Sequence, residues 1–150
     1  MLKIKIYHSR SKKETLIFRK AAQFYFNKLV KDDGNCSVSI ILKPAPEIGG
    51  EKVKAYTFKK KINFYEICLD NNFSIKKMLS ALAHEMVHVK QYFTCQLFDS
   101  TESLVSWKAK MIDTEKVAYF DQPWEVESYR REKYLVRKFK EYCKKNGIEL

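Results

Sequence analysis

Two histidines spaced four residues apart, with a glutamate directly after the first, are the side chains of this sequence best suited to chemistry. They are His84, Glu85 and His88, in the stretch SALAHEMVHVKQYF at residues 80–93. On an α-helix, positions i and i+4 share one face, so both imidazoles could reach a single tetrahedral zinc ion. Glu85 stands beside them, where it could accept a proton from an attacking water molecule.

The helix around this motif helps to separate a metal site from an ordinary helix surface. A shuffled chain of the same composition would contain the pattern roughly 0.5% of the time, so the match alone is insufficient. Ser74 can cap a helix that runs to about Cys95, and His84 and His88 fall nearly opposite its apolar stripe. That stripe consists of Ile75, Leu79, Leu82, Met86 and Phe93. The histidines are therefore not explained as core residues, and we expect them to bind metal rather than to be merely solvated.

A catalytic zinc site normally has three protein ligands, so a third donor must come from another part of the chain. The candidates are His8, at the end of the first expected strand, and Glu125 and Glu127 in the stretch QPWEVESYR. A lone histidine at a strand end is more often structural, and acidic residues in a first helical turn are favoured by the helix dipole alone. A carboxylate on a second helix nevertheless completes the coordination in sites of the HExxH-plus-glutamate type.

The remaining elements form an α+β pattern around the motif. Alternating or β-branched residues predict strands over residues 2–8, 36–43, 51–58 and 61–70, the last of them apolar on both faces and so internal to the sheet. A helix is expected before the second strand, from Ser11 to about Val30. Residues 103–112 are expected to be extended.

Capping residues mark the expected helix ends. Ser11 and Glu14 fit a reciprocal capping box, in which each side chain binds the other's backbone amide. For the last helix, Asp121 is expected to cap and Pro123 to occupy the first turn, while Gly147 is a natural stop.

Composition predicts one globular domain over residues 1–150. The sequence has 150 residues, of which 45% are hydrophobic, enough for one core. The four cysteines are scattered without a CxxC pair and are expected to be reduced thiols. The N-terminal residues lack the apolar stretch of a secretion signal, and no apolar run reaches the ~20 residues that span a membrane. We therefore expect a soluble, cytoplasmic protein without a membrane partner.

The net charge of +11 favours polyanions or acidic partners. The basic residues are spread along the sequence, with a single run at Lys59, Lys60 and Lys61. Contact with nucleic acid through this surface is one interpretation, and an ordinary solvated basic surface is the other.

HEMVHVKQ followed by QPWEVESYR resembles the phage and bacterial SprT-like and related gluzincin-type metallopeptidases, in which the active-site helix is followed by a helix beginning with a WEhEA-like motif (h, hydrophobic). The resemblance covers about residues 60–132. It implies that His84, His88 and Glu125 bind zinc and that Glu85 is the general base. Glu125 is favoured over Glu127 because the first glutamate of the ExE pair supplies the ligand in families with that arrangement.

The sequence departs from this family pattern at two points. SprT-like proteins commonly use a third histidine, which this sequence lacks after His88, so Glu127 remains a rival ligand. Several gluzincins carry an aspartate one turn beyond the glutamate ligand, where this sequence has Tyr129. The carboxylate that usually supports a zinc-binding histidine is therefore missing from its expected position.

The resemblance implies a minimal zincin-like domain that hydrolyses peptide bonds: a small mixed β-sheet, an active-site helix and a C-terminal helix carrying the third ligand. The substrate would be a protein or peptide, bound extended along an edge of the sheet. Tyr119, Tyr129 or His8 could stabilise the oxyanion. The alternative is a zinc-stabilised, non-catalytic module that binds protein or DNA. Glu85 favours the enzyme, because a purely structural zinc site needs no glutamate there and normally closes with four protein ligands.

Overall fold

The computed structural model of the protein describes residues 1–31, 34–44, 47–48 and 51–150. Its main sheet contains β1 (Leu2–Tyr7), β2 (Cys36–Lys43), β5 (Ala55–Lys61) and β6 (Phe64–Asp70), in the order β1-β2-β6-β5. β1, β2 and β6 are parallel, whereas β5 runs antiparallel to β6. β6 is internal, as its apolar sequence predicted. Among the described strands, β5 has β6 as its one neighbour and therefore forms an edge of the sheet.

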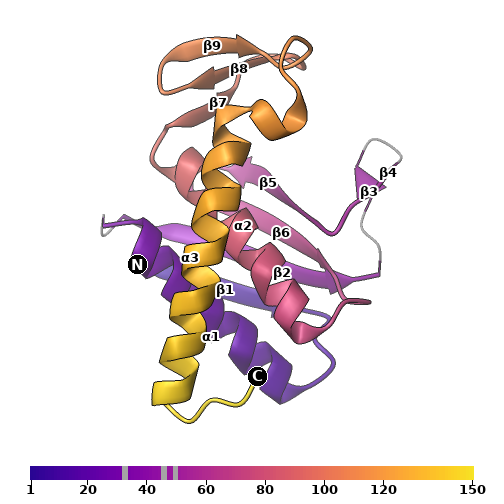
Figure 1. Ribbon diagram of the computed structural model, residues 1–150, viewed down its shortest axis with the longest axis vertical. Coiled ribbons are helices and arrows are strands. Elements are labelled where there is room, and N and C mark those ends of the chain that lie inside the picture. Colours follow the sequence, from indigo (N-terminus) through magenta and orange to yellow (C-terminus); the bar gives the residue numbers. More distant parts are fainter. Residues whose placement is uncertain (32–33, 45–46, 49–50) are drawn as a thin grey trace.

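The fold has three long helices, α1 (Lys12–Leu29), α2 (Ile75–Phe93) and α3 (Pro123–Lys145). α1 and α2 pack on the main sheet, and α3 packs on these two helices. α2 contacts β5 and β6 on one side and α3 on the other, and α3 crosses in front of it in Figure 1. The arrangement confirms the predicted mixed α and β architecture. No helix of the described residues is long and apolar enough to cross a membrane.

Two small sheets complete the described chain. β3 (Glu47–Ile48) pairs with β4 (Glu51–Lys52), and β7 (Leu97–Asp99), β8 (Leu104–Trp107) and β9 (Lys110–Asp113) form a three-stranded antiparallel sheet. The β7–β9 sheet lies at the end of the molecule where α3 begins, joined to it by the short 3₁₀ helix η1 (Tyr119–Asp121). It thereby forms one wall around the start of α3.

The hydrophobic core lies between the main sheet and the three helices. Leu79, Leu82 and Met86 of the predicted α2 stripe are fully buried, while Ile75 and Phe93 are partly buried at its ends. The opposite face of α2 is buried as well: His84 is 7% exposed and His88 is 9% exposed. The face with the histidines is therefore not solvated, because α3 covers it. All four cysteines are free thiols.

Several predicted element boundaries were wrong for local reasons. The strand predicted over residues 51–58 is divided, with β4 ending at Lys52 and β5 starting at Ala55. The strand predicted from Lys61 starts at Phe64, because Asn63 adopts a left-handed conformation (φ 57°) in the turn from β5. The strand predicted over residues 2–8 ends at Tyr7, since His8 also has a positive φ of 60°.

The predicted caps were correct in part. Ser74 Oγ accepts a hydrogen bond from the N–H of Lys77 (3.3 Å), as expected of an N-cap. Ser11 Oγ likewise accepts from the N–H of Glu14 (3.1 Å), but the Glu14 carboxylate binds the N–H and guanidinium of Arg10 instead of the Ser11 amide. The capping box is therefore only half formed.

The cap predicted for the last helix was wrong. Asp121 is not the cap, because it is the last residue of η1 and lies one position too early. The N-cap residue of α3 is Gln122, whose side chain makes no capping hydrogen bond. Pro123 does occupy the first turn, and Gly147 follows the helix with a φ of 63°.

The extended segment predicted over residues 103–112 is a tight hairpin. β8 and β9 are joined by Lys108 and Ala109, whose φ angles are 47° and 67°. Two-residue hairpin turns of this hand favour Asn-Gly, because glycine has no Cβ and asparagine tolerates a positive φ better than most residues. The Lys-Ala pair carries no such turn signal, so the hairpin could not be recognised from the sequence.

We expect Ala109→Gly to stabilise the protein by about 1 kcal/mol, because glycine adopts a positive φ without the Cβ clash that alanine suffers. The melting temperature should rise by about 2–4 °C in a thermal denaturation experiment. Lys110→Gly, in β9 beside the turn, is the control and should not stabilise. An equal rise in both variants would contradict the turn geometry.

Candidate metal centre

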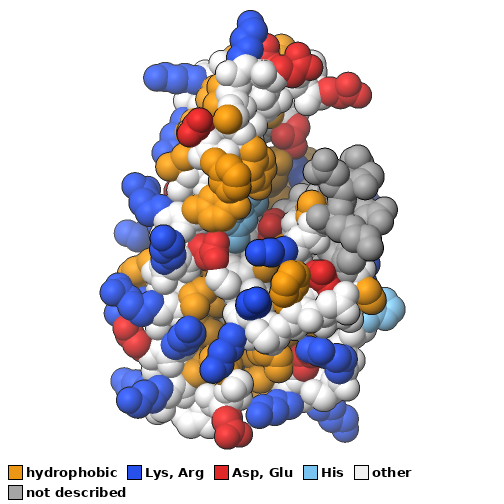
Figure 2. Space-filling model, turned by 45° about the vertical axis from the view of Figure 1, so that its right-hand side comes forward, with side chains coloured by type: hydrophobic (Ala, Val, Ile, Leu, Met, Phe, Trp, Pro, Cys, Tyr) orange, Lys and Arg blue, Asp and Glu red, His pale blue; other side chains and the backbone are white. Residues whose placement is uncertain are grey.

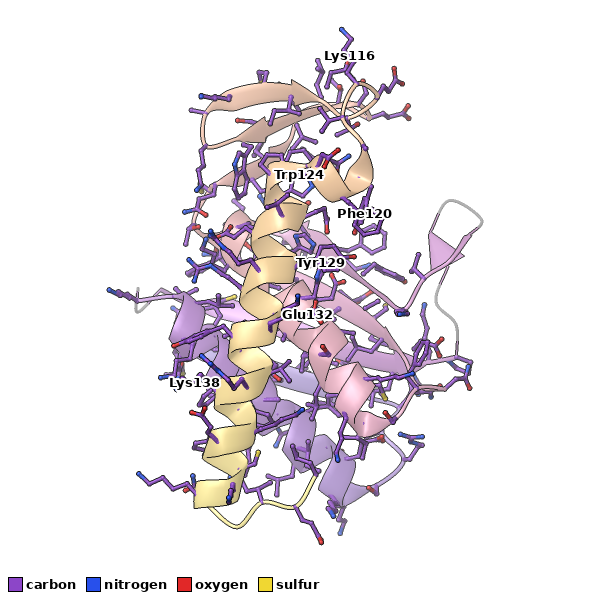
Figure 3. The ribbon with its side chains drawn as sticks, viewed as in Figure 1. Lys116, Phe120, Trp124, Tyr129, Glu132 and Lys138 are labelled. Carbon is purple, nitrogen blue, oxygen red and sulfur yellow. The ribbon has the colours of Figure 1, made fainter. Side chains whose placement is uncertain are left out.

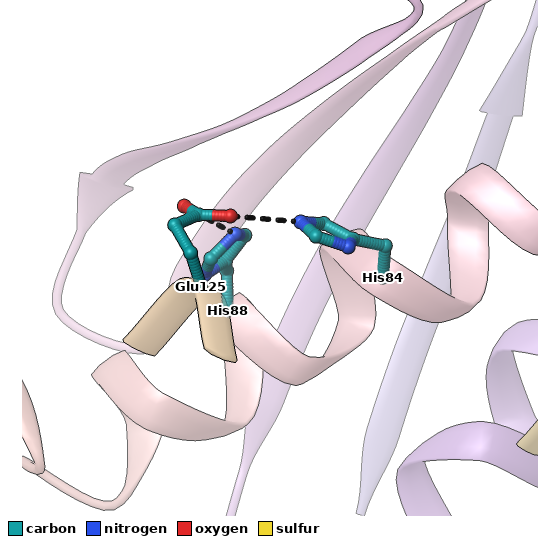
Figure 4. A group of neighbouring side chains, drawn as sticks. All are labelled: His84, His88 and Glu125. Atoms are coloured by element: carbon teal, nitrogen blue, oxygen red, sulfur yellow. Dashed lines mark hydrogen bonds and ion pairs between the residues drawn. The ribbon is translucent and has the colours of Figure 1, made fainter. Parts of the chain in front are cut away.

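α2 and α3 bring three potential metal ligands together. His84 Nε2 lies 3.1 Å from Glu125 Oε2, and His88 Nε2 lies 3.2 Å from Glu125 Oε1 (Figure 4). One donor atom from each of the three residues lies within 4.8 Å of the others, and all three residues are buried. Two imidazoles from one helix and a carboxylate from another thus meet at one point.

The start of α3 is fixed so that Glu125 faces α2. Trp124 packs in a small apolar cluster with Trp107 of β8 (ring centroids 6.2 Å apart), together with Leu97 and Val105. The side-chain amide of Gln91 in α2 donates to the Trp124 carbonyl (2.9 Å). The β7–β9 sheet and α2 therefore hold the first turn of α3 from both sides.

The other ring nitrogen of each histidine faces an acceptor. His84 Nδ1 lies 3.3 Å from Glu132 Oε2, and His88 Nδ1 lies 2.9 Å from Gln91 Oε1. The orientation of the Gln91 amide is set by its NH₂ group, which donates to Trp124 and Glu127. Nδ1 of each ring is therefore a donor, which leaves Nε2, directed at Glu125, as the atom that would bind a metal once it has lost its proton.

These donors fit a zinc ion. With Zn–N and Zn–O bonds of 2.0–2.1 Å, neighbouring ligand atoms of a tetrahedral site are about 3.3 Å apart. Each histidine Nε2 lies at about that distance from one oxygen of Glu125, 3.1 Å from Oε2 for His84 and 3.2 Å from Oε1 for His88. Two histidines and a glutamate leave a fourth position open, as in catalytic rather than structural zinc sites.

The electrostatics of the cluster favour an ionised Glu125. Burial opposes ionisation, but hydrogen bonds from His84, His88 and Tyr119 outweigh it and lower the Glu125 pKa to about 2. Burial also opposes a charged His84, yet its bonds to Glu125 and Glu132 raise the pKa to about 9. The site thus attracts positive charge, and a metal ion would compete with protons for the imidazoles.

Glu127, the rival ligand, has other partners. Its carboxylate accepts hydrogen bonds from Lys90 (2.8 Å), Gln91 (3.0 Å) and Arg131 (3.0 Å). Burial would raise its pKa, but these donors lower it to about 2. Glu127 is therefore more than an acidic residue favoured by the helix dipole. It neutralises the buried ammonium group of Lys90.

Glu85 is buried beside the cluster and is held from the edge strand. The hydroxyl of Thr57 in β5 donates a 2.6 Å hydrogen bond to Glu85 Oε2. Glu85 is 6% exposed and lines hollows on both sides of the cluster, one of about 530 Å³ and one of about 390 Å³. Its carboxylate is therefore accessible from the cleft.

The two hollows form a cleft along β5. Both are lined by Val53 and Ala55 at the start of this strand and by Tyr119 of η1. An apolar patch lies at the mouth of the cleft, directly above the pale blue atoms near the middle of the face shown in Figure 2. Its exposed aromatic side chains are Tyr119, Phe120 and Tyr129.

The three candidate oxyanion residues are placed very differently. Tyr119 lines both hollows, and the Tyr129 ring packs 4.5 Å from the His84 ring. His8 is exposed and follows β1, at the opposite edge of the main sheet from β5. It is therefore remote from the cluster both as a ligand and as an oxyanion donor.

Sequence reasoning missed Glu132, Gln91 and Thr57. Tyr129 occupies the position where a supporting aspartate was sought, but Glu132, labelled on α3 in Figure 3, supplies the carboxylate beside His84 instead. Glu132 is seven residues after Glu125 and so shares its helix face, a signal that was present. Gln91 is three residues after His88 on the same helix, whereas Thr57 lies far away in the sequence and has no local signal.

Comparisons of this chain with protein-family models, with curated proteins and with solved structures found no match.

We predict that the zinc affinity depends on Glu125 most and on Glu132 next. Glu125→Gln removes a charged ligand, while Glu132→Gln removes the negative charge beside His84 Nδ1 and should weaken zinc binding about 10–100-fold. Competition with a fluorescent zinc chelator measures both. Glu141→Gln, an exposed position of the same helix, is the control and should bind as the wild type does. If Glu127→Gln weakened zinc binding more than Glu125→Gln, the ligand assignment would be wrong.

Glu127 should instead matter for stability. Glu127→Gln leaves the Lys90 ammonium group buried without its counter-charge, which should cost about 3 kcal/mol of unfolding free energy. Denaturant titration in the presence of a chelator measures this loss without the metal. Because the folded pKa of Glu127 is lowered to about 2, the difference from wild type should be complete above about pH 5 and shrink as the pH falls toward 2. A difference that does not depend on pH would contradict the ion pair.

Proposed function

We propose that the protein is a zinc-dependent metallopeptidase with a minimal zincin-like domain, similar to the SprT-like or gluzincin-type enzymes. The observation that carries the proposal is the placement of Glu85 beside the converging donors of His84, His88 and Glu125, in a cleft that follows the edge strand. A metal site with an open position and an adjacent carboxylate is suited to hydrolysis.

The proposed reaction assigns one role to each residue. His84, His88 and Glu125 hold zinc, which when bound polarises the scissile carbonyl and makes water a better nucleophile. Glu85 accepts a proton from the attacking water as its oxygen bonds to the carbonyl carbon. Glu85 then passes this proton to the leaving nitrogen as the C–N bond breaks, which returns the carboxylate to its starting state.

The edge strand supports a peptide substrate. β5 is antiparallel to β6 and has a free edge among the described strands, and Val53, Ala55, Tyr56 and Thr57 line the cleft. An extended peptide can add to such an edge through main-chain hydrogen bonds. Thr57 also holds Glu85, so the strand that would align the peptide also aligns the base.

Tyr119 is the better placed of the two tyrosines to stabilise the oxyanion. Its side chain lines the cleft on both sides of Glu85 and interacts with Glu125. Although the ring is exposed, desolvation of the hydroxyl and the nearby Glu125 carboxylate raise the pKa of Tyr119, so the hydroxyl keeps its proton and can donate a hydrogen bond.

Glu85→Gln separates the enzyme from a non-catalytic binding module with the same metal site. The amide keeps the shape and the Thr57 contact but cannot accept the proton. We expect unchanged zinc content and melting temperature, with hydrolysis reduced at least ~100-fold. The assay is digestion of a diverse peptide library followed by mass spectrometry, with metal analysis of each sample.

Glu102→Gln, at an exposed position between β7 and β8, is the matched control and should digest the library like the wild type. If wild type and Glu85→Gln left identical peptides across the library, the peptidase would be refuted in favour of the binding module.

A further inference from the structure

The outer face of α3 carries a row of positively charged side chains. The helix contains eight Lys or Arg residues and four glutamates, and three of these glutamates, Glu125, Glu127 and Glu132, have hydrogen-bond partners in the interior of the protein. Five exposed basic residues recur at intervals of three or four and so share one face. This basic stripe consists of Arg130, Lys133, Arg137, Lys140 and Lys144, and it extends over about 21 Å of helix.

Four of these five residues line a groove. Lys133, Arg137, Lys140 and Lys144 surround a hollow of about 530 Å³ that also contacts Ser80 of α2. This groove is separate from the cleft along β5, although Ser80 and Glu132 border both.

The two acidic residues in the groove already have partners. Glu132 binds Ser80 and His84, and Glu141 binds Lys138 (2.8 Å). The cations of the basic stripe therefore face a concave surface with little competing negative charge.

An exposed aromatic ring lies beside the basic stripe. Tyr134 is 44% exposed, and the guanidinium group of Arg137 lies 6.0 Å from the centre of its ring. Sites for single-stranded nucleic acid combine a row of cations for the backbone phosphates with aromatic rings on which bases stack. A membrane-binding helix would instead present a broad apolar face, and the described outer face of this half of α3 offers Tyr134 alone as a large apolar group.

We propose that the basic stripe and Tyr134 form a binding site for single-stranded nucleic acid. The phosphates lie along the groove between α2 and α3, and a base stacks on Tyr134. The groove presents ammonium and guanidinium groups at near-regular intervals. These groups would bind the phosphates of the nucleic-acid backbone, so we expect binding to be independent of the nucleotide sequence.

The test compares two triple variants that each remove three positive charges. Arg137→Gln/Lys140→Gln/Lys144→Gln changes the basic stripe, while Lys3→Gln/Lys5→Gln/Lys12→Gln changes exposed residues of β1 and α1. Binding of a fluorescent oligothymidine of about 20 nucleotides is measured by anisotropy at several salt concentrations. Melting curves verify that both variants are folded.

The stripe variant should bind at least ~10-fold more weakly, and the slope of log K against log salt should decrease by about 2, since each lost phosphate contact contributes about 0.7. The control variant should change affinity less than ~3-fold. Equal weakening by both triples would overturn the site, as would undetectable binding by the wild type at low salt.

Tyr134→Ala tests the preference for single strands. It should weaken binding of the oligothymidine and leave binding of a duplex of equal length unchanged, because duplex bases are already stacked. Equal loss for both forms overturns the stacking role. Tighter binding to phosphatidylserine vesicles than to the oligonucleotide would overturn nucleic acid as the ligand.

The proposal does not depend on peptide hydrolysis. The groove uses neither the zinc ligands nor Glu85, so Glu85→Gln should bind the oligonucleotide like the wild type. Failure of the peptidase would therefore leave this site standing, and failure of nucleic-acid binding would leave the peptidase standing.

Discussion

The burial of α2 on both faces is the constraint on which the rest of the structure depends. One face carries the apolar stripe, and five further buried residues around the helix are polar, namely His84, Glu85, His88, Lys90 and Gln91. Buried polar groups are costly unless they have hydrogen-bond partners. No buried side-chain nitrogen or oxygen in the described part of the chain lacks a partner, and α3 and β5 supply most of those for α2. The candidate metal centre is thus also the polar interface that joins two helices.

This requirement divides α3 into two halves. Its first half turns Glu125, Glu127, Ser128 and Glu132 toward α2 and satisfies the polar face. Its second half turns Leu135, Phe139 and Cys143 into the hydrophobic core. The second half stabilises the position of α3 by burying apolar side chains. The first half can form its hydrogen bonds at only one register of α3 against α2, because a shift of one residue would move each carboxylate away from its partner. The core therefore stabilises the position at which the donors meet.

The sequence predicted the parts of this design that depend on local periodicity. The helix around the HExxH motif, the apolar stripe of α2 and the internal strand β6 follow from repeats of 3.6 and 2 residues. The β8–β9 hairpin did not, because Lys108 and Ala109 carry no turn signal. Thr57 beside Glu85 and the enclosure of both histidines by α3 were also missed. These features arise from contacts between distant parts of the chain, which local patterns do not encode.

The same design explains where the surplus positive charge lies. Glu125, Glu127 and Glu132 satisfy cations and imidazoles in the interior, so their charge contributes little to the field outside the protein. The basic residues of α3 have no matching set of exposed acids on that face, apart from Glu141. Inward glutamates and outward lysines and arginines are two consequences of one amphipathic helix. The helix that completes the candidate metal centre therefore concentrates positive charge on its outer surface, so a substitution that turned α3 about its axis would change both faces together.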